Sequence, residues 1–166
     1  MRTGNAHPAI GLPARIGAAC FLLWAVLHLW VGYAGVAEYV AGVDGQWAML
    51  LGGVNAPKDA FQYPTDPITA NAQAHLLLNF CLDVMGYGVL GLFVAWMIWR
   101  RGSWTGYLIG AIVIGIGDLA FLFCLVTPGI IEANLPTIAG PVLWFLAVLI
   151  TPFGMPREGR RWSPPA

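Results

Sequence analysis

Residues 75–88 read HLLLNFCLDVMGYG and open an apolar segment that continues to about residue 99. A helix needs roughly 20 mostly apolar residues to cross a bilayer, and this segment is long enough. Every fourth residue at its start is nevertheless polar: His75, Asn79, Asp83 and Tyr87. At 100° per residue, the four side chains fall within an arc of about 120° on a helix. The segment therefore predicts a spanning helix with one polar face, turned toward other helices or a wet cavity.

The composition of the whole chain indicates a membrane protein. Of the 166 residues, 58% are hydrophobic and only 10% are charged, and the mean hydropathy is +0.71. A soluble domain carries about 25% charged residues. The length allows one domain, so residues 1–166 are expected to form a single integral membrane domain. No basic patch with interleaved aromatic residues is present, so nucleic acid is not an expected partner.

Three further apolar segments accompany the one at 76–99, at about 16–37, 104–126 and 135–153. Backbone groups in lipid must form hydrogen bonds within their own segment, which favours helices. The sequence therefore predicts an all-α bundle of four transmembrane helices, with a long outer loop at 38–73 and a disordered tail at 157–166. The first segment is expected to stay in the protein, because its 22 apolar residues exceed the roughly 7–15 of a signal peptide.

Arginines predict the orientation of the bundle in the membrane. They occur only at the N-terminus, between the second and third segments and in the C-terminal tail: Arg2, Arg15, Arg100, Arg101, Arg157, Arg160 and Arg161. Positive charge accumulates on the cytoplasmic side of membrane proteins. We therefore expect a multi-pass protein of the cell membrane with both termini in the cytoplasm, and with loops 38–73 and 127–134 outside.

Three of the apolar segments carry an ionisable side chain in their outer half. Asp83 lies about 10 Å from the expected outer end of its helix, Asp118 about 12 Å and His28 about 13 Å, at 1.5 Å per residue. A carboxylate near the bilayer centre costs roughly 2.5–3.5 kcal/mol on insertion scales. The common depth predicts one polar site shared by three helices.

The faces of the helices support this site. His28 shares an arc of the first helix with Gly17, Gly32 and Gly35, and small residues mark close contacts between membrane helices. Tyr107 shares the face of Asp118. The alternative is that these polar groups only join helices, at about 0.6 kcal/mol per pair.

Neither a metal nor another cofactor is expected. His28, Asp83 and Asp118 could form a facial triad of metal ligands, but no helix offers a paired motif such as HxxxH, and metal ligands usually come with supporting hydrogen-bond partners. The cysteines Cys20, Cys81 and Cys124 lie singly inside apolar segments, which predicts buried thiols without a disulfide framework.

Three short motifs resemble the EXPERA superfamily of emopamil-binding and sterol isomerase-like proteins. They are FCLD at 80–83, RRGSW at 100–104 and TDP at 65–67. The resemblance implies a compact bundle whose cavity holds intramembrane acidic and histidine residues. The chain also resembles small bacterial four-helix membrane proteins, which have LH in the first helix and a proline-bearing loop before the fourth.

Three functions remain open at this point. The first is an isomerase- or cyclase-like enzyme that acts on an isoprenoid or sterol-like molecule. Asp83 and Asp118 would be the acid/base pair, with His28 relaying the proton, and His75, Asn79 and Tyr87 would bind the substrate. The second is a non-catalytic subunit or ligand-binding protein, and the third a proton-coupled transporter. The expected partners are membrane lipid, a hydrophobic small molecule, and a second copy or a larger membrane complex.

Overall fold

The structure is a computed structural model that describes residues 10–42 and 51–156. Its elements are helices, and four of the helices are long and apolar enough to cross a membrane, as expected. The first two are α1 (Leu12–Ala41) and α2 (Pro67–Arg101). The third, Trp104–Val126, consists of α3 (Trp104–Ile109), η2 (Gly110–Ile114), α4 (Gly115–Phe121) and η3 (Leu122–Val126). The fourth consists of α5 (Leu135–Ile150) and η4 (Thr151–Gly154).

The third and fourth spans have the predicted bounds, whereas α1 and α2 run beyond theirs. Helix α2 starts at Pro67 rather than near residue 76, because Asp66 caps it and accepts hydrogen bonds from the backbone N–H groups of Ile68 and Thr69 at 3.2 and 2.7 Å. Proline is favoured in the first turn of a helix, where its missing N–H is not needed. The loop expected at 38–73 is therefore only 42–66, with a short helix η1 (Lys58–Ala60) inside it. The tail 157–166 lies outside the described residues.

The cap at Asp66 gives the start of α2 a dependence on pH. Hydrogen bonds from Thr69, first through its side chain and then through its backbone, lower the pKa of the exposed Asp66 carboxyl. A carboxyl with a lowered folded pKa stabilises the fold above its unfolded pKa, and this contribution is lost as the pH falls through the folded value. We expect the amides of residues 68–70 to lose protection against hydrogen exchange below about pH 4. The Asp66→Asn variant, which still caps but does not ionise, should lose that pH dependence; an unchanged profile would contradict the role of the carboxylate.

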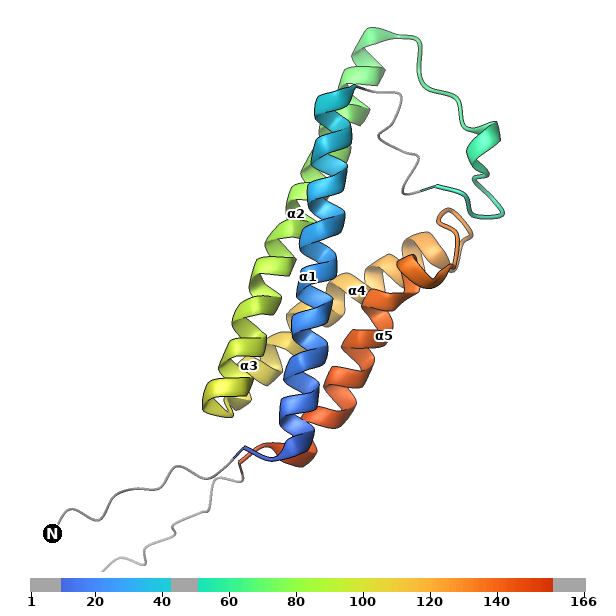
Figure 1. Ribbon diagram of the computed structural model, residues 1–166. Coiled ribbons are helices and arrows are strands. Elements are labelled where there is room, and N and C mark those ends of the chain that lie inside the picture. The colour runs from blue at the N-terminus through green and yellow to red at the C-terminus, as the bar shows by residue number, and fades with distance from the viewer. Residues whose placement is uncertain (1–9, 43–50, 157–166) are drawn as a thin grey trace, which may run out of the picture.

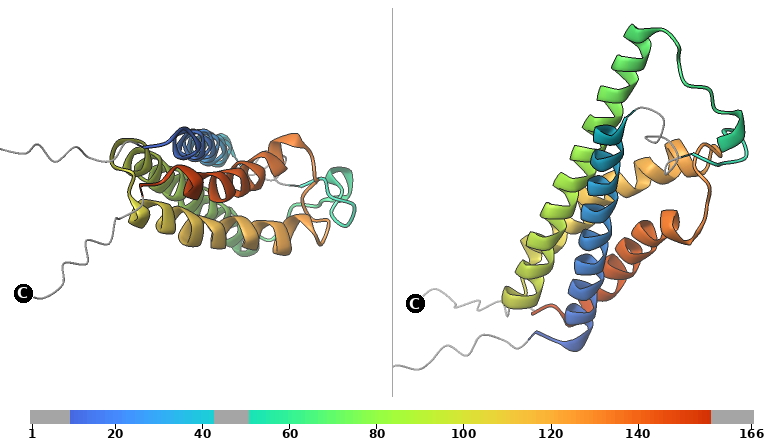
Figure 2. Two further views of the ribbon diagram at one scale, coloured as in Figure 1. Left: turned by 90° about the horizontal axis from the view of Figure 1, so that it is seen from below. Right: turned by 45° about the horizontal axis from the view of Figure 1, so that its top comes forward.

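Helices α1 and α2 lie side by side along most of their length (Figures 1 and 2). Their seam is made by glycines: Gly32 and Gly35 of α1 lie against Cys81 of α2, and Gly88 of α2 lies against Leu29 of α1. Without a Cβ atom at these positions the two backbones approach closely, as is usual between membrane helices. The predicted inward face of α1 is confirmed, since all three of its glycines on that arc are buried.

The third and fourth spans lean away from α1 and α2, so the bundle is narrow at one end and wide at the other (Figures 1 and 2). At the narrow end Gly11 donates a backbone hydrogen bond to Gly154 at 2.9 Å, and Trp104 Nε1 donates to the carbonyl of Pro156 at 3.0 Å. The start of α1, the turn after α2 and the end of η4 therefore meet there. That shared end is compatible with the predicted cytoplasmic side, which remains a prediction.

At the wide end, the outer loop is tied to the turn between η3 and α5. The backbone N–H of Asn55 donates to Gly129 at 2.8 Å, its side-chain Nδ2 donates to Pro128 at 2.7 Å, and Gly53 donates to Ile130 at 3.2 Å. Gly129 has a φ of 70°, which favours glycine in this turn. The loop thus links the α1–α2 pair to the other two spans (Figure 1).

Wide π-helical turns interrupt the third span at η2 and η3. The indole of Trp144 on α5 donates a hydrogen bond to the carbonyl of Gly110 in η2 at 3.0 Å, and a Cβ atom on Gly115 would overlap the same indole. Turns of this kind often occur at functional sites.

The contact at Gly115 predicts the effect of adding one methyl group. Gly115→Ala should destabilise the protein by about 1–3 kcal/mol, because the side chain overpacks the interface with Trp144. Gly86→Ala on α2 is the matched control, since a Cβ atom there meets open space. Thermal unfolding in detergent checks the pair, and equal melting temperatures for the two variants would contradict the packing of α5 against the third span.

Candidate functional site

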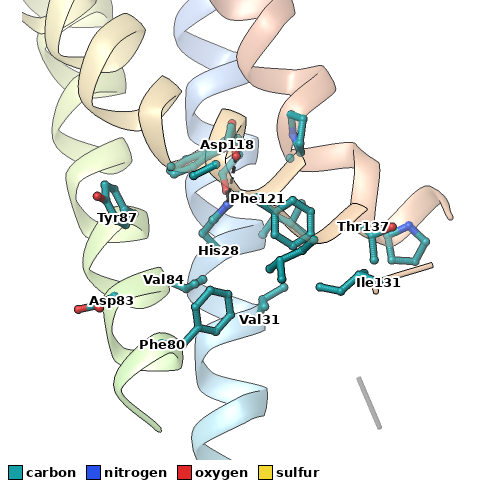
Figure 3. A pocket seen from close by; sticks show the side chains of 18 of the residues that line it. His28, Val31, Phe80, Asp83, Val84, Tyr87, Asp118, Phe121, Ile131 and Thr137 are labelled. Carbon is teal, nitrogen blue, oxygen red and sulfur yellow. Dashed lines mark hydrogen bonds and ion pairs between the residues drawn. The ribbon is translucent and has the colours of Figure 1, made fainter. Parts of the chain in front are cut away.

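The structure brings together two of the three predicted catalytic residues. Asp118 on α4 and His28 on α1 face each other, with 3.8 Å between Asp118 Oδ1 and His28 Nε2 (Figure 3). The Asp118 side chain is only 3% exposed and that of His28 is 19% exposed. Two of the three groups that the sequence predicts to share a site therefore meet in the structure.

Trp24 completes the pair and was not among the predicted site residues. Its indole Nε1 donates a hydrogen bond of 2.8 Å to Asp118 Oδ2. Its ring stacks on that of His28, with centroids 3.6 Å apart and an interplanar angle of 23°. Trp24 lies one helical turn before His28, so the sequence did contain the spacing that places both on one face. Nothing in that spacing distinguishes a hydrogen-bonding tryptophan from a packing one.

The hydrogen bonds of His28 determine which nitrogen faces Asp118. The ring Nδ1 lies 2.9 Å from the backbone carbonyl of Trp24. A carbonyl oxygen can only accept, so Nδ1 carries a proton and donates it. In neutral histidine, Nε2 is then a lone-pair acceptor that points toward the carboxyl group of Asp118. The pair thus has a place for one exchangeable proton, on either Nε2 or the carboxyl group.

Gly140 of α5 provides the space for the imidazole ring. A Cβ atom at this position would lie 2.9 Å from His28 Cε1 and 3.7 Å from both His28 Nε2 and Trp24 Nε1. The contact with His28 Cε1 would be closer than two carbon atoms normally approach, whereas the other two are ordinary van der Waals distances. Three spans therefore enclose the pair: α1 and α4 supply its side chains, and α5 supplies a surface without one.

A cavity of about 790 Å³ opens from this pair toward the wide end of the bundle. Its volume is within the range of roughly 300–1,000 Å³ that is usual for small-molecule sites. Figure 3 shows side chains of α1, α2, α4 and α5 around it. Much of the wall is apolar and includes Leu27, Val31, Phe80, Val84, Phe121 and Leu125. Such a surface suits a hydrophobic molecule, with the Asp118–His28 pair as the polar group at its inner end.

Only part of the predicted polar stripe on α2 faces the other helices. Tyr87 and Asp83 both line the cavity, but Asp83 is exposed, and the exposed Asn79 donates to it at 3.0 Å. The Asp83 side chain points away from His28 and Asp118 in Figure 3. The reason is the tilt of the third span: α4 leaves α2 beyond the contact of Gly117 with Tyr87. No other helix then covers that face of α2 in the described part of the chain.

Asp83 and Asp118 also lie at different distances from the turn that joins their two spans. Asp83 precedes Arg101 by eighteen residues, about 27 Å of helix, whereas Asp118 follows Trp104 by fourteen, about 21 Å. Asp83 thus lies about 6 Å nearer the outer end, before tilt is considered.

His75 lies outside the cavity and connects the outer ends of α1 and α2. Its Nδ1 donates to the carbonyl of Asn71 at 2.9 Å, which leaves Nε2 to accept from the hydroxyl of Tyr39 at 3.3 Å. It is exposed and does not line the cavity. The structure therefore places this predicted substrate-binding residue away from the pocket.

The thiols and possible metal ligands are dispersed. Cys81 is buried, Cys20 is half-buried and Cys124 is exposed at the cavity wall, so the prediction of buried thiols is wrong for Cys124. Cys124 is exposed because η3, which contains it, diverges from α2 and is left uncovered. Within residues 10–42 and 51–156, no three His, Cys, Asp or Glu side chains gather closely enough to hold a metal ion.

Comparison of the chain with protein families, curated proteins and solved structures finds no match. The resemblance to the EXPERA superfamily thus rests on the three short motifs alone. The proposal of a function has to come from the geometry of the cavity.

Proposed function

We propose that this protein is a membrane enzyme that moves a proton on a hydrophobic small molecule held in the cavity. The observation that supports this most directly is the buried Asp118 carboxyl, 3.8 Å from His28 Nε2 at the inner end of an apolar cavity. An acid/base pair at the end of an apolar pocket suits an isomerase- or cyclase-like reaction on an isoprenoid or sterol-like skeleton.

The proposed reaction leaves the proton count of the pair unchanged. The pair gives its proton to one carbon of a double bond, which leaves a cation at the other carbon. It then takes back a different proton from the carbon on the far side of that cation, so the double bond shifts by one position. The cation formed between the two steps would face Tyr87 and Phe121, whose rings line the cavity and can stabilise positive charge. Trp24, which also lines the cavity, would position the Asp118 carboxyl through its hydrogen bond.

The arginines and the site together suggest where the substrate comes from. With both termini in the cytoplasm, the wide end of the bundle faces outward and the cavity opens in the outer half of the membrane. The substrate would then be a molecule dissolved in the cell membrane, and the lipid itself would be the first partner of the protein.

Solvent exchange tests the proposed reaction without knowledge of the substrate. Proteoliposomes made with a total lipid extract are incubated in D₂O, and carbon-bound deuterium is measured by mass spectrometry. Proton addition and removal at carbon should label one hydrophobic species in the presence of the protein. Labelling no greater than in liposomes with the Asp118→Asn variant would contradict the proposal.

A non-catalytic role has one specific observation in its favour. The hydrogen bond from Trp24 to Asp118 joins α1 to α4, so the carboxyl group already has a structural use. A ligand-binding protein or a subunit of a larger complex would retain a hydrophobic molecule, or co-purify with other chains, and show no exchange in D₂O. Proton-coupled transport is less favoured, because the chain has no internal repeat; substrate flux in proteoliposomes that depends on Asp118 would support it instead.

A further inference from the structure

The outer end of the cavity carries a second polar site, formed by Glu38 and Lys58. Glu38 belongs to the last turn of α1, and Lys58 is the first residue of η1 in the outer loop. Glu38 Oε2 is buried and has no hydrogen-bond partner in the described part of the chain. A buried acceptor without a partner is unfavourable, so an oxygen at this position is suited to a donor from a bound molecule.

Lys58 lies near Glu38 without satisfying it. The two side chains are close enough to influence each other electrostatically. The Lys58 ammonium nitrogen and the Glu38 carboxyl oxygens are nevertheless more than 4.0 Å apart. Among the described residues, His28–Asp118 is the one ion pair within that distance. A gap between a carboxylate and an ammonium group accommodates a hydroxyl group, which donates to the first and accepts from the second.

The inner end of the cavity has the same property. His28 Nε2 and Asp118 Oδ1 are 3.8 Å apart, which is too long for a direct hydrogen bond. An oxygen atom between them would lie within about 2.8 Å of both. Because the pair holds one proton, it offers one donor and one acceptor, which again matches a hydroxyl group. A hydroxyl bound there would relay the pair's proton to and from the nearby double bond of the ligand.

The two polar sites are separated by an apolar wall of defined length. Glu38 follows His28 by ten residues on the same helix, which is about 15 Å. Val31, Phe80 and Phe121 line the cavity between them. We infer that the ligand is an elongated hydrophobic molecule with a hydroxyl group at each end, about 15 Å apart. This inference rests on the proposed function, because it assigns the class of ligand for the same cavity.

Binding of two simple alcohols tests the inference. The protein in nanodiscs is titrated with dodecane-1,12-diol or dodecan-1-ol, and the affinities are referred to the concentration of each alcohol in the lipid. The diol should bind at least about tenfold more tightly, because only the diol can form hydrogen bonds with both ends. Glu38→Leu should remove this preference, whereas Asp59→Leu, at an exposed residue beside Lys58 that does not line the cavity, should leave it unchanged.

The possible failures can be told apart. Equal affinity of the wild-type protein for the two alcohols would overturn the second polar site and leave the proposed acid/base reaction standing. A preference for the diol that survives Glu38→Leu would also overturn the assignment to Glu38. If a folded protein binds neither alcohol, the cavity is not a site for such ligands, and both the inference and the proposed function fail.

Discussion

Asp118→Asn should reduce deuterium incorporation into the substrate by about 10²- to 10⁴-fold, which is the usual contribution of a general acid or base. The asparagine can still accept the hydrogen bond from Trp24, so the contact between α1 and α4 is retained. What it loses is the exchangeable proton between the carboxyl group and His28. The measurement is the initial rate of exchange in D₂O, and a loss below about tenfold would contradict the proposed acid/base role.

Asp83→Asn distinguishes between two possible acid/base pairs, Asp83 with Asp118 and Asp118 with His28. If Asp83 and Asp118 act as the pair that the sequence predicts, the two variants should lose similar activity. If Asp118 works with His28, as their contact suggests, Asp83→Asn should have the smaller effect, because the exposed Asp83 side chain points away from both residues (Figure 3). Glu132→Gln, an exposed carboxylate that does not line the cavity, is the control for a general effect of charge.

Trp24→Phe should destabilise the protein by about 2–4 kcal/mol, the second large effect that we expect. The change retains an aromatic ring next to His28 but removes the indole N–H, so Asp118 Oδ2 keeps no protein donor. Asp118→Leu should be destabilising for the converse reason, since it leaves the indole N–H without an acceptor. The free energy of unfolding, measured by denaturant titration in mixed micelles, quantifies both.

The double variant gives the sharper test of this hydrogen bond. Once Trp24 is replaced, Asp118→Leu leaves no unsatisfied donor, so the double variant should cost at least about 1 kcal/mol less than the sum of the two changes. Trp144→Phe is the matched control, because that indole donates to the backbone carbonyl of Gly110. The free-energy cost of Trp144→Phe should simply add to that of Asp118→Leu. If the costs of Trp24→Phe and Asp118→Leu were additive too, the 2.8 Å hydrogen bond between Trp24 and Asp118 would be contradicted.

The four spans could be predicted because long apolar segments in lipid have only the helix available. The start of α2 was missed because TDP, with its proline, was interpreted as part of a loop. Asp66 and Pro67 are also a favourable helix cap and first residue, and the structure uses them so. The sequence alone does not decide between these two interpretations of one motif.

The expectation that His28 and Asp118 share one site followed from depth and helix face, which are both properties of single helices. The position of Asp83 depends instead on the angle between α2 and the third span. That angle results from packing contacts between the two spans, such as Gly106 with Met97, and no periodicity within one helix contains it. The same limit applies to Gly140 and Glu38, whose importance depends on what lies opposite them.

The identity of the molecule retained in the cavity tests the central claim most directly. Wild-type protein and the Asp118→Asn variant are purified from the same membranes, and the bound hydrophobic molecules are compared by chromatography coupled to mass spectrometry. If the Asp118–His28 pair moves a proton, the variant should retain one double-bond isomer and the wild-type protein a mixture of that isomer with its product. The same single species in both proteins would show that the cavity binds its ligand without acting on it.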